Sequence, residues 1–184
     1  DEAETIARLA PAGSVLKAVA FEATREAALG AALRDFRFVH FATHGVADTT
    51  RPALSGLIFS LVDRQGRPRN GYVRLQDIYD LRLRADAVVL SACETALGPE
   101  VKGEGLMGLA RAFMYAGAPR VVASLWAVDD SATAELMTRF YDGLLGRGLT
   151  PSAALREAQR ALQRLPQWAD PYFWAGFTVA GDWR

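Results

Sequence analysis

A buried strand that carries a thiol to its carboxyl end is predicted by the run Ala87-Val88-Val89-Leu90-Ser91-Ala92-Cys93. A second apolar run, Phe38-Val39-His40-Phe41-Ala42-Thr43-His44-Gly45, carries an imidazole to its own carboxyl end. Continuous apolar runs of this length are typical of strands buried on both faces of a parallel sheet. Because α/β proteins place their chemistry at the carboxyl ends of such strands, we expect Cys93 and His44 to meet at one edge of the sheet.

Strand-like and helix-like segments alternate along the chain, which indicates crossover connections and a mainly parallel sheet with helices on both faces. The predicted strands are Ser14–Ala20, Phe36–Ala42, Leu54–Val62, Ala87–Ala92, Arg120–Trp126 and Tyr172–Val179. The predicted helices are Glu2–Leu9, Thr24–Leu33, Leu75–Leu81, Gly105–Ala116, Asp130–Leu145 and one that Pro151 opens. The turn-rich stretch 63–71 is expected to be a hairpin loop.

Composition favours one compact domain over residues 1–184, since 51% hydrophobic and 23% charged residues suit a single sizeable core. The 21 basic residues balance the 21 acidic ones, so no overall field favours nucleic acid or an anionic membrane. The apolar runs at 121–128 and 173–180 are shorter than the roughly 18 residues of a membrane helix. The one cysteine cannot form an internal disulfide, and a reactive thiol suits a reducing compartment, so we expect the cytoplasm.

The spacing of the histidine and the cysteine is itself informative. His44 and Cys93 lie 49 residues apart (93 − 44), and a histidine about 50 residues before an Ala-Cys signature is the caspase pattern. Together with Ser124-Leu-Trp-Ala-Val-Asp-Asp130, the two motifs around His44 and Cys93 resemble the CHAT domain, a bacterial caspase-like cysteine peptidase related to separase. The resemblance runs from about residue 1 to residue 182. It implies a caspase-like three-layer α/β sandwich.

A thiol and an imidazole that meet can cleave a peptide by acyl transfer. The thiolate attacks, and the imidazole holds the proton and returns it to the leaving amine. The resemblance implies that the backbone N–H groups of Gly45 and Cys93 form the oxyanion hole, and a glycine lets a carbonyl approach the backbone closely. No third member of a triad is evident.

His40 and His44 are four residues apart, which on a helix would form a zinc-binding couple. The surrounding Phe38, Val39, Phe41 and Thr43 favour a strand instead, and two histidines with one cysteine are too few ligands for a zinc site. We therefore expect no metal, and we expect His40 to be a buried, hydrogen-bonded structural residue.

Gly103-Glu-Gly-Leu-Met-Gly108 matches the dinucleotide pattern G-x-G-x-x-G. That fingerprint belongs in the tight turn directly after a strand, whereas residues 94–102 intervene here, and Glu104 would put a carboxylate beside the pyrophosphate. We therefore expect no cofactor, and we expect these glycines to let the loop after Cys93 fold closely and start its helix.

Two aspartates, Asp129 and Asp130, follow the strand that comes next after the cysteine strand. Either can cap the following helix, or a carboxylate there can face a bound side chain, because consecutive parallel strands are often neighbours. The separase resemblance favours substrate contact. It implies that Asp130, with Asp129 as the fallback, lines a pocket for arginine or lysine.

Two function classes stay open. The first is a cysteine endopeptidase that cuts a protein partner, and the second is a catalytically silent peptidase-like interaction module. The chain starts with Asp1 inside a helical pattern, so we expect it to be the C-terminal part of a longer chain. The resemblance implies tetratricopeptide repeats upstream of it. A third class, a metal-dependent hydrolase, would require bound zinc.

Overall fold

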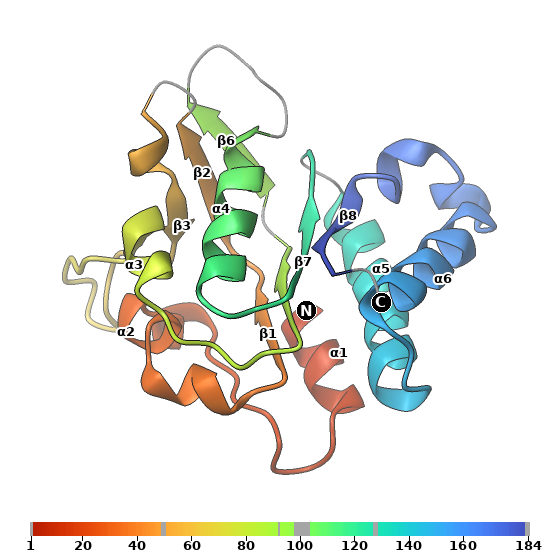
Figure 1. The fold of residues 1–184 in the computed structure, drawn as a ribbon, viewed down its shortest axis with the longest axis horizontal. Coiled ribbons are helices and arrows are strands. Elements are labelled where there is room, and N and C mark those ends of the chain that lie inside the picture. The colour runs from red at the N-terminus through yellow and green to blue at the C-terminus, as the bar shows by residue number, and fades with distance from the viewer. Residues whose placement is uncertain (1, 49–50, 92, 98–103, 127–128, 183–184) are drawn as a thin grey trace.

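In the computed structural model, which describes residues 2–48, 51–91, 93–97, 104–126 and 129–182, four strands form a central sheet (Figure 1). Their order is β1 (Phe38–Phe41), β5 (Ala87–Leu90), β7 (Arg120–Ser124) and β8 (Phe177–Gly181). β1, β5 and β7 are parallel, and β8 runs antiparallel to β7. The predicted mainly parallel sheet is therefore confirmed.

A second sheet continues from the carboxyl ends of β1 and β5. Its strands are β4 (Tyr72–Arg74), β3 (Gly56–Ile58), β2 (His44–Asp48) and β6 (Cys93–Leu97), in that order. β2 and β6 are parallel, whereas β3 is antiparallel to both β2 and β4. β2 follows β1, and β6 follows β5, after only two residues each, so the same two segments of the chain contribute to both sheets.

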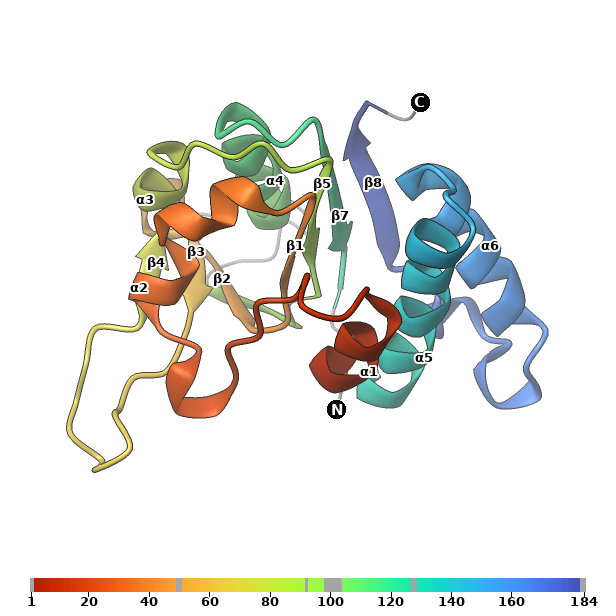
Figure 2. The same cartoon turned by 90° about the horizontal axis from the view of Figure 1, so that it is seen from below.

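Helices cover both faces of the central sheet, as Figure 2 shows edge-on. On one side lie α2 (Arg25–Ala28), α3 (Leu75–Tyr79) and α4 (Glu104–Tyr115), and on the other lie α1 (Glu2–Leu9), α5 (Asp130–Tyr141) and α6 (Pro151–Gln163). Side chains alternate along β5: Val88 packs in the core that contains Phe113 of α4, and Val89 in the core that contains Phe140 of α5. These three layers agree with a caspase-like α/β sandwich.

Short turns complete the described elements. They are the 3₁₀ turns Ala20–Glu22, Ala31–Asp35, Pro52–Leu54, Pro166–Trp168 and Pro171–Phe173, and the π-helical turn Asp142–Gly146. The π turn directly continues α5, so the predicted helix to Leu145 is confirmed with a wider last turn. None of the helices within the described ranges is both long and apolar enough to cross a bilayer.

The helix ends follow their local sequence. Gly117 lies just beyond α4 with a φ of +114°, a backbone conformation that glycine adopts without strain. The Thr150 side chain accepts a hydrogen bond from the Ala153 N–H at the start of α6, and Pro151 occupies the first turn. The predictions for the end of α4 and the start of α6 are therefore confirmed.

The prediction of a strand at Ser14–Ala20 is wrong. Residues 11–20 are exposed and outside both sheets, and Leu16 keeps 58% of its surface in solvent. Backbone turns bound the segment, because the Ser14 N–H donates to the Pro11 carbonyl and Ala20 has a φ of +50°. An apolar run becomes a strand only where a neighbour accepts its backbone hydrogen bonds, and none of the described strands pairs with this one.

Three predicted elements are shorter than expected because turns replace their ends. Leu54–Val62 is reduced to β3, with the 3₁₀ turn Pro52–Leu54 at its start, and Tyr172–Val179 starts only at Phe177 because Pro171–Phe173 forms another 3₁₀ turn. Thr24–Leu33 forms a helix only over α2 before Leu29 ends it.

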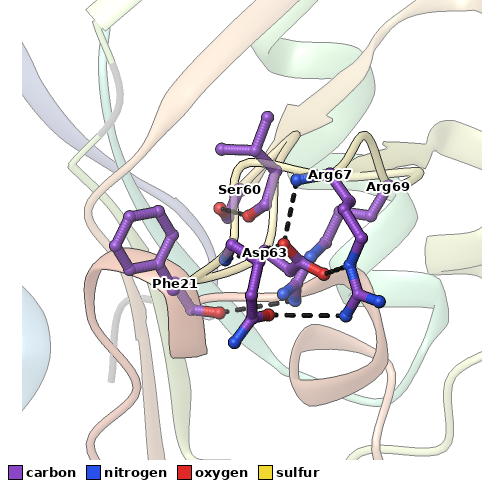
Figure 3. A network of polar contacts seen from close by, with 7 residues as sticks. Phe21, Ser60, Asp63, Arg67 and Arg69 are labelled. Atoms are coloured by element: carbon purple, nitrogen blue, oxygen red, sulfur yellow. Dashed lines mark hydrogen bonds and ion pairs between the residues drawn. The ribbon is translucent and has the colours of Figure 1, made fainter.

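The hairpin predicted for residues 63–71 is confirmed, since β3 and β4 are antiparallel neighbours. Figure 3 shows Asp63 at the centre of the loop. Its carboxylate accepts hydrogen bonds from the backbone N–H groups of Gln65 and Arg67, both at 2.9 Å, and from the Arg67 guanidinium at 2.6 Å. These hydrogen bonds hold the pKa of the Asp63 carboxyl below its ordinary value, and the bond from the backbone N–H of Arg67 contributes most.

Candidate active site

His44 and Cys93 begin two neighbouring parallel strands. β2 starts at His44, β6 starts at Cys93, and the two residues are direct Cα partners in the ladder. Adjacent strands lie about 4.8 Å apart, and partners in a ladder share one face of the sheet, so the fold brings these two backbone positions together. His44 is exposed, and the side chain of Cys93 lies outside the described part of the structure.

The expectation that each residue lies at the carboxyl end of its strand needs correction. β1 ends at Phe41 and β5 at Leu90, so His44 and Cys93 start the next strand instead. The cause lies partly in Thr43, whose hydroxyl donates a hydrogen bond to the Ile58 carbonyl of β3. This bond links the residue before β2 to β3, and β2 then pairs with β3 as well as with β6.

Gly45 is buried between two strands. It is aligned with Leu57 of β3 on one side and with Glu94 of β6 on the other. The two backbone positions predicted to form an oxyanion hole, Gly45 and Cys93, thus lie one residue apart along the same ladder.

His40 does not lie with His44. Its ring is mostly buried between β1 and the helices, with 14% of the side chain exposed. Nδ1 lies 3.0 Å from the Tyr141 hydroxyl, and Nε2 lies 3.2 Å from the Glu2 carboxylate. The ring is thus largely shielded from solvent and hydrogen-bonded through Nδ1, as predicted.

Sequence reasoning missed the groups that surround His40. Glu2, His40, Ser91 and Tyr141 form what we call the interior polar cluster, in which the Ser91 hydroxyl donates to the Glu2 carboxylate at 3.2 Å. Burial, and next the nearby charge of Glu2, raises the pKa of the Tyr141 phenol far above its ordinary value. No local pattern could have found this cluster, because its members come from α1, α5 and the strand ends.

Asp129 and Asp130 both lie at the surface, where β7 leads into α5. Asp129 caps α5, since its Oδ1 accepts the backbone N–H groups of Ser131 at 3.0 Å and Ala132 at 2.9 Å. Asp130 is the first residue of the helix. β7 is the direct neighbour of β5, so both aspartates follow a strand adjacent to the one that leads to Cys93.

The glycine-rich motif starts outside the described residues, at Gly103. Its remainder lies within α4, where Gly105 and Gly108 are helical. No strand of the described residues leads directly into it, because β6 ends at Leu97.

Comparisons with known proteins identify a family and two relatives. The model of the CHAT domain matches residues 1–182. Over 106 residues the chain is 43% identical to tetratricopeptide repeat protein 28 of Mus musculus and 39% identical to that of Homo sapiens. Each match covers 58% of this chain and only 4% of the mammalian protein.

The family match covers almost the whole chain, far more than the two mammalian relatives do. It includes the paired strands that start at His44 and Cys93 and the helical layers on both sides of the central sheet. The chain therefore belongs to the CHAT domain family, whose members are caspase-like and related to peptidases.

Proposed function

We propose that this CHAT domain is a cysteine endopeptidase in which Cys93 is the nucleophile and His44 the general base. The observation that carries the proposal is the register of β2 and β6, in which the two residues are direct partners. A thiol needs a base within hydrogen-bond reach to become an efficient nucleophile, and the neighbouring ladder positions of the two residues support such proximity.

The reaction is an acyl transfer in two steps. The Cys93 thiol gives its proton to the His44 imidazole, and its sulfur forms a bond to the scissile carbonyl carbon. The C–N bond then breaks as His44 returns the proton to the leaving amine. A water molecule, deprotonated by His44, hydrolyses the resulting thioester and regenerates the thiol.

The negative charge on the carbonyl oxygen needs donors in the intermediate. The backbone N–H groups of Gly45 and Cys93 are our candidates, and their neighbouring ladder positions support a shared role. Gly45 has no side chain to keep a substrate carbonyl away from the backbone.

Asp130, with Asp129 as the fallback, is our candidate for recognising a basic residue before the scissile bond. A carboxylate pairs bidentately with a guanidinium, which gives geometric selectivity as well as energy. Asp129 already accepts two backbone hydrogen bonds as the cap of α5, which supports Asp130 as the residue more available to a substrate.

The partners follow from the relatives. Both mammalian proteins are named for tetratricopeptide repeats, which supports a parent chain in which such repeats accompany this domain and present or control a protein substrate. A single reactive cysteine suits a reducing compartment, so we assign the activity to the cytoplasm.

A catalytically silent interaction module is the second candidate. Both mammalian relatives are named for tetratricopeptide repeats, and a parent chain with such repeats supports an interaction role. The two candidates differ in the reactivity of Cys93, because an interaction module has no need of an activated thiol.

The experiment that separates them uses a peptide library and a thiol-directed electrophilic probe on the longer parent protein. The peptidase predicts probe labelling at Cys93 and site-specific cleavage, both absent from the Cys93→Ala variant. Unlabelled Cys93 with intact partner binding would support the silent module instead.

A further inference from the structure

A carboxylate from the first helix contacts both chain segments that lead to His44 and Cys93. The Glu2 Oε1 atom of α1 is 3.2 Å from the His40 Nε2 atom of β1, and the Ser91 hydroxyl just after β5 donates to Oε2 at 3.2 Å. Figure 2 shows α1 packed beside α5, on one side of the sheet. Glu2 thus connects β1, the residue that follows β5, and α1.

This contact is largely shielded from water. The side chains of Glu2 and His40 are 17% and 14% exposed. Glu2 Oε1 and His40 Nε2 are inaccessible to solvent, and neither accepts or donates a hydrogen bond among the described residues, so their 3.2 Å contact is a close polar approach without hydrogen-bond geometry. Because water reaches neither atom, loss of the Glu2 carboxylate would leave His40 Nε2 buried without this polar contact.

Tyr141 determines which way the imidazole is oriented. Its buried phenol stays protonated, since burial raises the pKa of that group, and its hydroxyl lies 3.0 Å from His40 Nδ1. When the phenol O–H donates to Nδ1, the neutral imidazole carries its hydrogen on Nε2, the nitrogen 3.2 Å from the Glu2 carboxylate. The interior polar cluster therefore fixes the imidazole from both sides.

The position along the strands is what gives the contact a role. His40 precedes His44 by four residues, and Ser91 precedes Cys93 by two. The Ser91 N–H donates to the Phe41 carbonyl at 3.0 Å. This is the last hydrogen bond that the structure describes between the two segments before β2 and β6 begin. Glu2 therefore holds both segments at the point where they leave the central sheet.

We propose that Glu2 is a positioning residue: by binding His40 and Ser91 it sets the approach of His44 to Cys93 and makes the site sensitive to the placement of α1. The proposal rests on the proposed peptidase function. Any partner or preceding domain that lifts α1 from the sheet would separate the His44 imidazole from the Cys93 thiol. Return of α1 to the sheet would bring the two groups together again.

The test measures the pH dependence of Cys93 alkylation by iodoacetamide in the full chain, together with peptide turnover. In Glu2→Ala we expect the midpoint of the alkylation profile to rise toward that of an ordinary thiol, about 8.5. We also expect kcat to fall about tenfold with KM nearly unchanged, since a positioning defect acts on the chemical step. Loss of stability alone would leave the midpoint of the folded protein in place.

Matched variants complete the design. Glu4→Ala alters the same helix but removes only surface ion pairs with Arg8 and Lys17, and it should behave as wild type. Glu2→Gln retains hydrogen-bonding atoms and should restore most of the activity. Ser91→Ala removes one of the Glu2 contacts and leaves the sequence of α1 unchanged, so this variant carries the test if Glu2→Ala does not fold.

The outcomes separate the two proposals. A wild-type thiol with an ordinary profile and no turnover contradicts the peptidase, and the positioning role with it. A lowered wild-type midpoint that persists in both Glu2→Ala and Ser91→Ala overturns the positioning role alone and leaves Glu2 as a structural anchor.

Discussion

His44 and Cys93 keep the register of the strands that precede them. Phe41 pairs with Leu90 and His44 pairs with Cys93, and in both pairs the residues are 49 positions apart. The two chain segments therefore pass through their interruptions without slipping. The separation of histidine and cysteine in the sequence equals the register offset of two parallel strands, so strand pairing fixes it.

Removing either member of the pair should abolish proteolysis without unfolding the domain. Cys93→Ala deletes the nucleophile, and His44→Ala should lower kcat by about 100- to 10,000-fold because general-base catalysis is worth that much. Turnover of a cleavable peptide and circular dichroism measure the two effects. His40→Ala should mainly lower stability, by about 1–3 kcal/mol, because it leaves buried polar groups unpaired, and its effect on kcat should not exceed the roughly tenfold loss expected for Glu2→Ala. Undiminished turnover in His44→Ala would refute the assignment.

Chelation should leave activity unchanged, whereas thiol alkylation should stop it. The thiol supplies the nucleophile, so no metal-bound water is needed. Turnover is compared before and after EDTA treatment and dialysis, with iodoacetamide as the positive control for inhibition. If EDTA removed activity and zinc restored it, the metal-dependent hydrolase would replace the peptidase.

Substrates with arginine or lysine before the scissile bond should be cut faster than those with aspartate or methionine. Asp130→Ala should erode that preference, because it removes the carboxylate that pairs with the basic side chain. Asp129→Ala should instead cost about 1 kcal/mol of stability through loss of the α5 cap. Specificity constants for the four substrates and urea unfolding provide the comparison. A preference that survives in both variants would leave capping as the established role.

The hairpin loop should loosen in acid. The folded-state pKa of Asp63 is lowered, so its stabilising contribution is present above the unfolded value and is lost as the pH falls through the folded pKa, below 3.8. NMR shifts of the Gln65 and Arg67 amides, which donate to Asp63, should report this step. Asp63→Asn should remove it, and the same step in that variant would assign the transition to another group.

Gly117→Ala should destabilise the domain by about 1–3 kcal/mol, the usual cost of a strained backbone conformation. A Cβ atom there would lie 2.4 Å from the Leu83 carbonyl oxygen, in addition to the strain of a φ of +114°. Gly108→Ala in α4 is the matched control, since its Cβ meets nothing within 4 Å and alanine favours a helix by about 1 kcal/mol. Equal unfolding midpoints for the two variants would contradict this account.

Local patterns were sufficient to predict the elements around the site. The apolar runs before His44 and Cys93, the cap of α5 and the glycine after α4 are all properties of short stretches. Ser14–Ala20 failed because a strand depends on a neighbour, which its own residues do not specify. The interior polar cluster could not be predicted for the same reason, because Ser91 contacts Glu2 across 89 positions and His40 contacts Tyr141 across 101.

The exposed segment after α1 allows the attachment of that helix to be measured by proteolysis. Lys17 lies among residues 11–19, which are all exposed and outside both sheets, so the segment is open to a protease that cuts after lysine. A single cut there would leave α1 attached by noncovalent contacts alone, with Ile6 and Leu9 against the core and Glu2 against His40. The time that the severed peptide stays bound would then measure directly how firmly the first helix is held.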